Sequence, residues 1–142
     1  MNFSKIIILS VIITSIILCY NKTYAQSSPE EITETFFTIF ENDMSAAVDY
    51  LFSTNELIDP NQPGIKSIKE KMEVTRKLLG NFYGYETVNI YYAGESYQKH
   101  IYSIKYERQP VNMTIIYYKP NNKWKVQSLN FQDDIDSELR LK

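Results

Sequence analysis

The chain has 142 residues, with 15 Lys or Arg against 17 Asp or Glu, so its formal net charge is −2. A mildly acidic chain without a cluster of basic residues is poorly suited to the phosphate backbone of DNA or RNA. We therefore expect no nucleic-acid partner.

The first 25 residues have the pattern of a secretory signal peptide. Lys5 supplies a positive start, and an uncharged run from Ile6 to Leu18 follows it. At about 1.5 Å per residue this run reaches roughly 20 Å, short of the ~30 Å hydrocarbon core that a membrane anchor must cross. Thr23 and Ala25 provide the small residues of a cleavage site. We therefore predict a signal peptide over residues 1–25.

Cleavage at this site would leave one exported α+β domain, residues 26–142, with no stable membrane span. Two lysines leave with the signal peptide and no acidic residue does, so the predicted net charge falls from −2 to −4. Leu18 stands before Cys19, where a lipoprotein signal has a small residue, so we assign Cys19 to the discarded peptide. The domain would then contain no cysteine, which excludes a disulfide and a thiol nucleophile. The Ile-, Lys- and Asn-rich composition indicates a bacterial protein, in the periplasm or secreted.

The first helix is predicted to begin at Pro29. Ser28 precedes it, and Glu31 stands three residues after Ser28, which is the spacing of a capping box. Apolar residues then recur at helical spacing from Ile32 to Phe40. Acidic residues in the first turn suit the positive end of the helix dipole.

Two further helices are predicted before the apolar pattern changes from helical to strand spacing. A short helix starts at Ser45, and a longer one runs from Ile65 to about Leu79, where Gly80 is well placed to end it. Between them, the segment 59–64 contains two prolines and a glycine and breaks the helical pattern.

From Tyr85 onward the apolar period changes to two, which predicts β-strands. The predicted strands are Glu86–Ala93, Tyr97–Arg108, Val111–Lys119 and a fourth that begins at Trp124. Pairing Ala93 with Tyr97, and Tyr117 with Val126, gives antiparallel hairpins that keep one apolar face continuous. In this register Val88 lies opposite Tyr102.

The sequence leaves the pairing of the second and third strands open, and it predicts an irregularity in the fourth strand. Pairing Arg108 with Val111 would place Tyr102 beside Tyr117, whereas a four-residue loop at this connection would preserve the same faces. In the last strand the inward phase slips by one residue, which predicts a β-bulge near Gln127 and hence a curved sheet.

Three helices followed by a four-stranded meander, with Trp124 opening a bulged last strand, resemble the nuclear transport factor 2-like fold. The resemblance covers residues 29–134 and implies N-terminal helices packed on a curved four-stranded antiparallel sheet. Such a cone often leaves a pocket. The stretch from Lys105 to Pro110 is also similar to a group of small exported bacterial proteins of unknown function. This similarity implies no activity for the chain.

The predicted inward face of the sheet is rich in tyrosine. It carries Tyr92, Tyr102, Tyr106 and Tyr117, together with His100, the only histidine of the chain. Two interpretations stay open: a core of large residues whose hydroxyls reach the rim, and an aromatic cavity that suits a small, mostly apolar molecule.

Arg108 completes the set of candidate ligand-binding residues. It ends the second predicted strand, near Asp133 and Asp134, which follow the fourth. An ion pair with either aspartate is one interpretation, and an anchor for a ligand carboxylate is the other.

We predict a non-catalytic binding or interaction module, because no catalytic constellation, metal-ligand spacing or cofactor motif is present. The alternative, implied by the resembled fold, is a ketosteroid-isomerase- or dehydratase-like enzyme that uses His100 with Tyr102 or Tyr106. The outer sheet face carries a predicted apolar patch, which suits a homodimer or another protein partner. Its members are Tyr91, Ile101, Ile116 and Tyr118.

Overall fold

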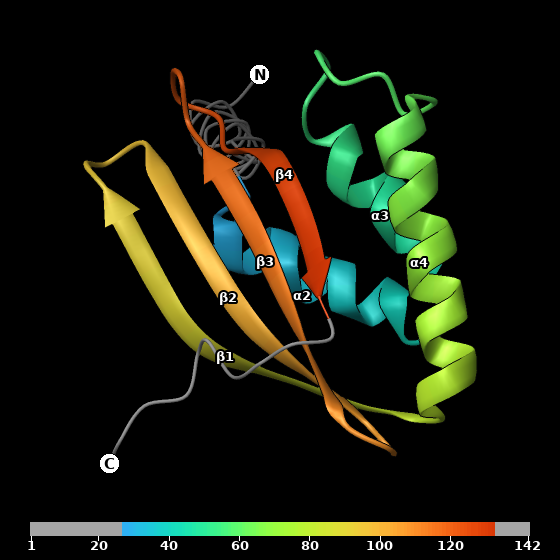
Figure 1. The fold of residues 1–142 in the computed structure, drawn as a ribbon. Helices are drawn as coiled ribbons and strands as arrows, with labels where there is room; N and C mark the ends of the chain where they lie inside the picture. Colours follow the sequence, from blue (N-terminus) through green and yellow to red (C-terminus); the bar gives the residue numbers. More distant parts are fainter. Residues whose placement is uncertain (1–26, 133–142) are drawn as a thin grey trace, which may run out of the picture.

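Three helices precede four strands along the chain (Figure 1). The helices are α2 (Pro29–Phe40), α3 (Met44–Ser53) and α4 (Pro63–Leu79), and the strands are β1 (Phe82–Ala93), β2 (Tyr97–Tyr106), β3 (Pro110–Tyr118) and β4 (Lys125–Gln132). These elements come from a computed structural model that describes residues 27–132, so the predicted signal peptide and Cys19 lie outside it. The strands form one antiparallel sheet in the order β1-β2-β3-β4. The predicted α+β class, with helices packed on a four-stranded antiparallel sheet, is confirmed.

The helix ends follow the capping residues of the sequence. At α2 the predicted capping box is present: the Ser28 hydroxyl accepts from the Glu31 amide at 3.2 Å, and the Glu31 carboxylate accepts from the Ser28 amide at 3.0 Å. The second helix begins at Met44, one residue before the predicted start at Ser45, and the Asp43 side chain caps it. The third begins at Pro63, whose fixed φ suits the first helical position, and ends at Gly80 with φ +82°.

The helices and the sheet share one apolar core. Figure 1 shows α2 crossing one face of the sheet, while α3 and α4 stand beside β4. Alternate residues of β2 and β3 meet α2, as the period-two pattern predicted. Core side chains of these three elements that are at most 2% exposed include Ile32, Phe36, Phe40, Tyr102, Ile104, Val111, Met113, Ile115 and Tyr117.

Side chains of α4 and of the two residues that follow α3 bond to the outer edge of β4. The amide of Val126 donates to the Thr54 hydroxyl at 2.9 Å, and its carbonyl accepts from the Asn55 amide group at 3.0 Å. Lys71 Nζ donates to the Phe131 carbonyl at 2.7 Å. An exposed strand edge is a site for unwanted pairing, so these bonds protect β4 and also attach the helices to it.

The sheet register confirms the two outer hairpins and corrects the middle one. Ala93 pairs with Tyr97, and Tyr117 pairs with Val126, as predicted. The Arg108–Val111 pairing was wrong. Lys105 instead pairs with Pro110 across the four-residue loop that the sequence left open, and Tyr102 therefore faces Met113 rather than Tyr117. Because the shift is an even number of residues, every side chain keeps its predicted face.

Two bulges shape the strands. The one predicted near Gln127 is present, since Ile116 pairs with Ser128 and Tyr117 with Val126. A second one, which the sequence did not predict, lies in β1: Thr87 and not Val88 pairs with Tyr102. The first strand is also longer than predicted, beginning at Phe82, and its pairing is irregular between Phe82 and Tyr85. This early part of β1 forms one wall of the site described next.

Candidate functional site

A groove runs between α2 and the first half of β1. It contains two adjoining pockets, with volumes of about 410 Å³ and 130 Å³, which share Glu34 and Tyr85 as lining residues. We call the larger one the Phe82 pocket and the smaller one the His100 pocket. The extra length of β1 makes this groove, because Phe82, Gly84 and Tyr85 all precede the predicted start of the strand at Glu86.

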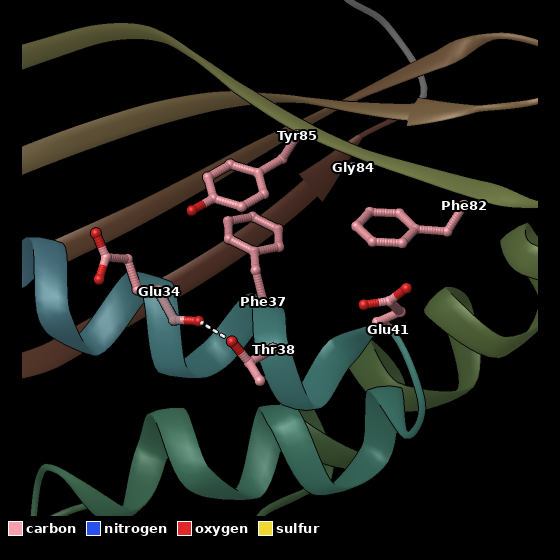
Figure 2. Close-up of a pocket in the computed structure, with 7 residues that line it drawn as sticks. All are labelled: Glu34, Phe37, Thr38, Glu41, Phe82, Gly84 and Tyr85. Carbon is pink, nitrogen blue, oxygen red and sulfur yellow. Dashed lines mark hydrogen bonds between the residues drawn. The ribbon is translucent and has the colours of Figure 1, made fainter.

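The Phe82 pocket has aromatic walls and an acidic rim (Figure 2). Phe37 from α2 and Tyr85 from β1 stack with ring centroids 3.6 Å apart and planes inclined by 13°. Phe82 forms the facing wall. Figure 2 shows Glu34 on one side of the stacked pair and Glu41 on the other. Burial raises the pKa of the Tyr85 phenol, and the nearby Glu34 carboxylate raises it further.

The His100 pocket lies at the other end of the groove, under the first turns of α2. Glu30, Thr33 and Glu34 line it from the helix, and His100 and Tyr102 line it from β2. Both β2 residues are almost fully buried, at 1% and 2% exposure. Buried polar side chains of the core therefore form the bottom of this pocket.

A chain of five hydrogen-bonding side chains passes beneath this pocket. The Tyr117 hydroxyl lies 2.7 Å from Thr33 Oγ1, which lies 2.8 Å from the Tyr102 hydroxyl. The Tyr102 hydroxyl lies 2.8 Å from His100 Nδ1, and His100 Nε2 lies 2.7 Å from Gln98 Oε1. Because the amide oxygen of Gln98 only accepts, Nε2 carries the proton of the neutral ring and Nδ1 accepts from Tyr102. The Thr33 hydroxyl has one proton and donates to the Pro29 carbonyl at 2.8 Å, so the direction of donation is assigned only at the His100 end of the chain.

Burial is the main cause that lowers the pKa of His100 below its ordinary value of 6.5, and the Glu30 carboxylate acts weakly in the opposite direction. The neutral ring fits the donor chain described above. At neutral pH His100 is therefore an uncharged link between Tyr102 and Gln98.

The lowered pKa of His100 predicts that the free energy of unfolding depends on pH. The unfolded chain binds a proton at His100 near pH 6.5, whereas the folded chain binds it only at lower pH, so folding loses free energy as the pH falls below 6.5. Each pH unit between the two pKa values contributes about 1.4 kcal/mol. We expect urea unfolding between pH 7.5 and 5.5 to show a larger loss of stability in the wild type than in His100→Gln, since the variant lacks this group. An NMR titration of the single histidine that gave a pKa of 6.5 or higher would contradict the account.

The structure brings together some of the predicted ligand-binding residues and separates others. His100 and Tyr102 line the pocket, and Tyr117 lies directly behind Tyr102 with no exposed surface. The Tyr106 hydroxyl lies elsewhere in the core and donates to Met44 Sδ at 3.8 Å. Tyr92 shares the predicted side of β1 but is 65% exposed, so its predicted inward burial was wrong.

The three buried tyrosines are protonated at neutral pH. Burial raises the pKa of Tyr102 and of Tyr106 to about 12, and burial raises that of Tyr117 further still. They can donate hydrogen bonds but do not act as phenolate bases.

Arg108 lies far from this chain of hydrogen bonds, in the loop between β2 and β3. Its side chain is exposed, and its backbone amide donates to the Leu79 carbonyl at 3.0 Å. With Leu78 and Gln109 it lines a separate hollow of about 240 Å³ at the end of α4. The predicted partners Asp133 and Asp134 lie outside the described residues.

Sequence reasoning missed the residues that form the Phe82 pocket. Glu34, Phe37 and Glu41 were assigned to an ordinary amphipathic helix, and Phe82 and Tyr85 to the connection before the first strand. One signal was available: Glu30, Glu34 and Glu41 are four and seven residues apart, so they follow one face of the helix.

The outer sheet face differs from the predicted apolar patch. Ile101 is only 1% exposed and pairs with Thr114, whereas Tyr91 and Tyr118 are 45% and 43% exposed. On the same face Asn112 is 6% exposed, and its Oδ1 has no hydrogen-bond partner among the residues that the structure describes. The exposed part of the patch is therefore smaller than the sequence suggested.

Within residues 27–132 no group of His, Asp and Glu side chains is arranged to hold a metal ion. No helix in that range has the length and apolar character needed to cross a membrane. No protein-family model, curated protein or solved structure matches this chain.

Proposed function

We propose that this chain is an exported, non-catalytic binding domain of the nuclear transport factor 2-like type, and that it holds a small molecule with an apolar body in the groove between α2 and β1. The observation that carries the proposal is the Phe82 pocket, with a volume of about 410 Å³ between Phe37, Tyr85 and Phe82. Ligand pockets in proteins have volumes of roughly 300–1,000 Å³ and combine apolar walls with a few polar groups.

The binding role rests on what the aromatic rings offer. Tyr85 covers a face of Phe37, which is only 4% exposed, so the apolar surface open to a ligand comes from Tyr85 and Phe82. The adjoining His100 pocket extends this space by about 130 Å³. Tyr85 and Phe82 are half-buried, so a ligand can cover ring surface that water now contacts. Covering apolar surface is worth roughly 25 cal/mol per Å² before the costs of association.

The non-catalytic assignment rests on His100. A general base needs a free lone pair within hydrogen-bonding distance of the substrate proton. Both ring nitrogens of His100 already bond to protein groups, at 2.8 Å and 2.7 Å, and the ring is 1% exposed. The isomerase-like alternative would require this arrangement to open, and Tyr106 lies outside the His100 pocket.

The outer sheet face is the second candidate binding surface. Tyr91 and Tyr118 expose nearly half of their surface there, and a homodimer or another protein partner would cover them. Because Ile101 is already buried, this surface offers less apolar area than the sequence predicted. We therefore rank it below the groove.

Native mass spectrometry of protein purified from its host tests both candidates at once. We expect the wild type to carry a bound small-molecule mass. Thr38 lines the Phe82 pocket and is exposed, so Thr38→Trp should fill the pocket and abolish the bound mass.

Thr35→Trp is the matched control for this experiment. Thr35 is exposed on the same helix, bonds to the carbonyl four residues before it as Thr38 does, and lies outside both pockets. The control should retain the ligand. Equal ligand content in the two variants would contradict the groove, and a bare dimer would favour the sheet face.

A further inference from the structure

The centre of the outer sheet face is buried, although the helices lie on the other face. Ile101 is 1% exposed, and Ser103 and Asn112, which pair with each other, are 9% and 6% exposed. Figure 1 shows α2 crossing the opposite face, with α3 and α4 beside β4. Within the part of the chain that the structure describes, the apolar core that contains residues of all three helices leaves Ile101 out. The burial of Ile101 therefore has a cause other than the helices.

The neighbouring strands do not account for this burial. Ile101 pairs with Asn89 on one side and Thr114 on the other, and both of these residues are partly exposed. Side chains of adjacent strands stand beside one another on a sheet and not over one another. The exposure is also that of a single chain, so a second copy is not needed to explain it. We conclude that another part of the same chain lies over Ile101.

Asn112 shows that the cover needs a polar group. Its Oδ1 is buried and accepts no hydrogen bond from any residue in the range 27–132. Its strand neighbours Val111 and Met113 belong to the core under the helices, so Asn112 points to the outer face. Buried side-chain oxygens in proteins nearly always accept a hydrogen bond. A segment that covers this face should therefore bring a donor to Asn112.

The chain leaves the sheet beside Asn112. Gln132, the last residue of β4, is the pairing partner of Asn112. The ten residues 133–142 follow it, and an extended segment of this length reaches about 33 Å. Crossing from β4 to β1 requires only about 15 Å, because neighbouring strands lie roughly 4.8 Å apart. Residues 133–142 are thus long enough to cross the whole face.

The sequence of residues 134–142 alternates between apolar and charged positions. The even positions are all charged, and the odd positions are Ile135, Ser137, Leu139 and Leu141. This period of two predicts an extended segment with one mainly apolar side. Such a side suits the surface around Ile101.

The charges of the segment and of the sheet face are complementary. The outer face of the strands carries Lys99, Lys105 and Lys125 against Glu86, which already pairs with Lys105 at 3.1 Å. Neither Lys99 nor Lys125 takes part in a salt bridge with another described residue. Residues 133–142 contain four acidic and two basic side chains. Exposed ion pairs contribute little to stability, so these charges favour the placement while the apolar contacts hold it.

From these observations we infer that residues 133–142 fold back as an extended strap over the outer face of β3 and β2. The apolar side of the strap covers Ile101, and one of its backbone amides donates to Asn112 Oδ1. The strap closes the second candidate binding surface, so a homodimer or another protein partner can use that face only by displacing it. This inference does not depend on the groove between α2 and β1.

Methyl NMR of the full chain tests the contact itself. We expect nuclear Overhauser cross-peaks between the methyl groups of Ile101 and those of Ile135 or Leu139, with intensities that dilution does not change. Cross-peaks that occur only between differently labelled chains in a mixed sample would place a second copy on the face and overturn the strap. A spectrum in which Ile101 has no contact with residues 133–142 would also overturn it.

Serine substitutions on the two sides of the strap provide matched variants. Ile135→Ser and Leu139→Ser should each shift the amide signals of Ile101, Ser103 and Thr114, because they remove apolar cover. Asp136→Ser changes the charged side of the same segment and should leave those signals in place. All three residues follow the last strand, so the variants should keep the circular dichroism spectrum of the wild type. Identical outer-face spectra for Ile135→Ser and Asp136→Ser would contradict the inference.

Discussion

Replacing Phe40 with alanine should destabilise the domain by about 3–5 kcal/mol, which is the usual cost of removing a buried phenylalanine ring. The Phe40 ring is 1% exposed and packs against Phe36 and Phe82, with both centroid distances at 5.4 Å. It therefore joins the helix to the first strand. Because small domains are stable by only about 5–15 kcal/mol, this single change should remove a large part of the stability.

Urea unfolding followed by circular dichroism measures the effect of Phe40→Ala. Leu57→Ala is the control, because Leu57 is 88% exposed and its truncation should change the stability by less than about 0.5 kcal/mol. A loss below about 1 kcal/mol for Phe40→Ala would mean that α2 does not pack on the sheet as described.

The second large effect concerns the hydroxyl of Thr33. It lies within 2.7–2.8 Å of both the Tyr117 and Tyr102 hydroxyls, and it also bonds to the Pro29 carbonyl at 2.8 Å. Thr33→Val keeps the shape but leaves the fully buried Tyr117 hydroxyl without this partner. A buried polar group that loses its hydrogen bond costs about 1–3 kcal/mol, so we expect a loss of about 2–3 kcal/mol.

A double-mutant cycle tests this explanation directly. Tyr117→Phe removes the stranded hydroxyl, so the pair Thr33→Val/Tyr117→Phe should be more stable than the sum of the single changes by about 1–2 kcal/mol. Thr35→Val, an exposed change on the same helix with the same bond to the preceding turn, should have an effect within about 0.5 kcal/mol. Additive single effects would show that the two hydroxyls do not depend on each other.

Those parts of the fold that depend on local signals could be predicted from the sequence. The capping box at Ser28 and the stop at Gly80 each depend on neighbouring residues only, and both are present. The alternation of apolar residues along β2 and β3 identified the face that packs on the helices. It did not predict that Ile101 and Ser103, on the other face of β2, are buried too. The bulge at Gln127 was also predictable, since the apolar phase slips at that point.

The register of β2 against β3 was not determined by the same signals. A shift of four residues keeps every side chain on its face, so the apolar pattern cannot distinguish the two pairings. The loop 106–109 decides between them. In the structure the Arg108 amide bonds to the Leu79 carbonyl and the Glu107 amide to the Asn81 carbonyl, contacts that join the loop to a distant part of the chain.

The groove could not be predicted because it depends on where β1 starts and how it bends. The alternating pattern begins at Tyr85 and the predicted strand at Glu86, whereas pairing begins at Phe82 and is irregular around Gly84, which has φ +106°. This irregular segment places Phe82 and Tyr85 against α2. Tyr92 shows the opposite error. The alternation along the strand predicted the correct side of the sheet for this residue, but its ring is 65% exposed. Alternation therefore predicts which side a residue faces and not whether it is buried.

Amide-shift mapping by NMR with a small-molecule extract of the host tests the groove most directly. We expect shifts at Thr38, Glu41, Gly84 and Tyr85 from wild-type protein, and loss of these shifts in Thr38→Trp. Shifts confined to Thr114 and Asn130 on the outer face would contradict it, as would a wild-type spectrum that the extract leaves unchanged.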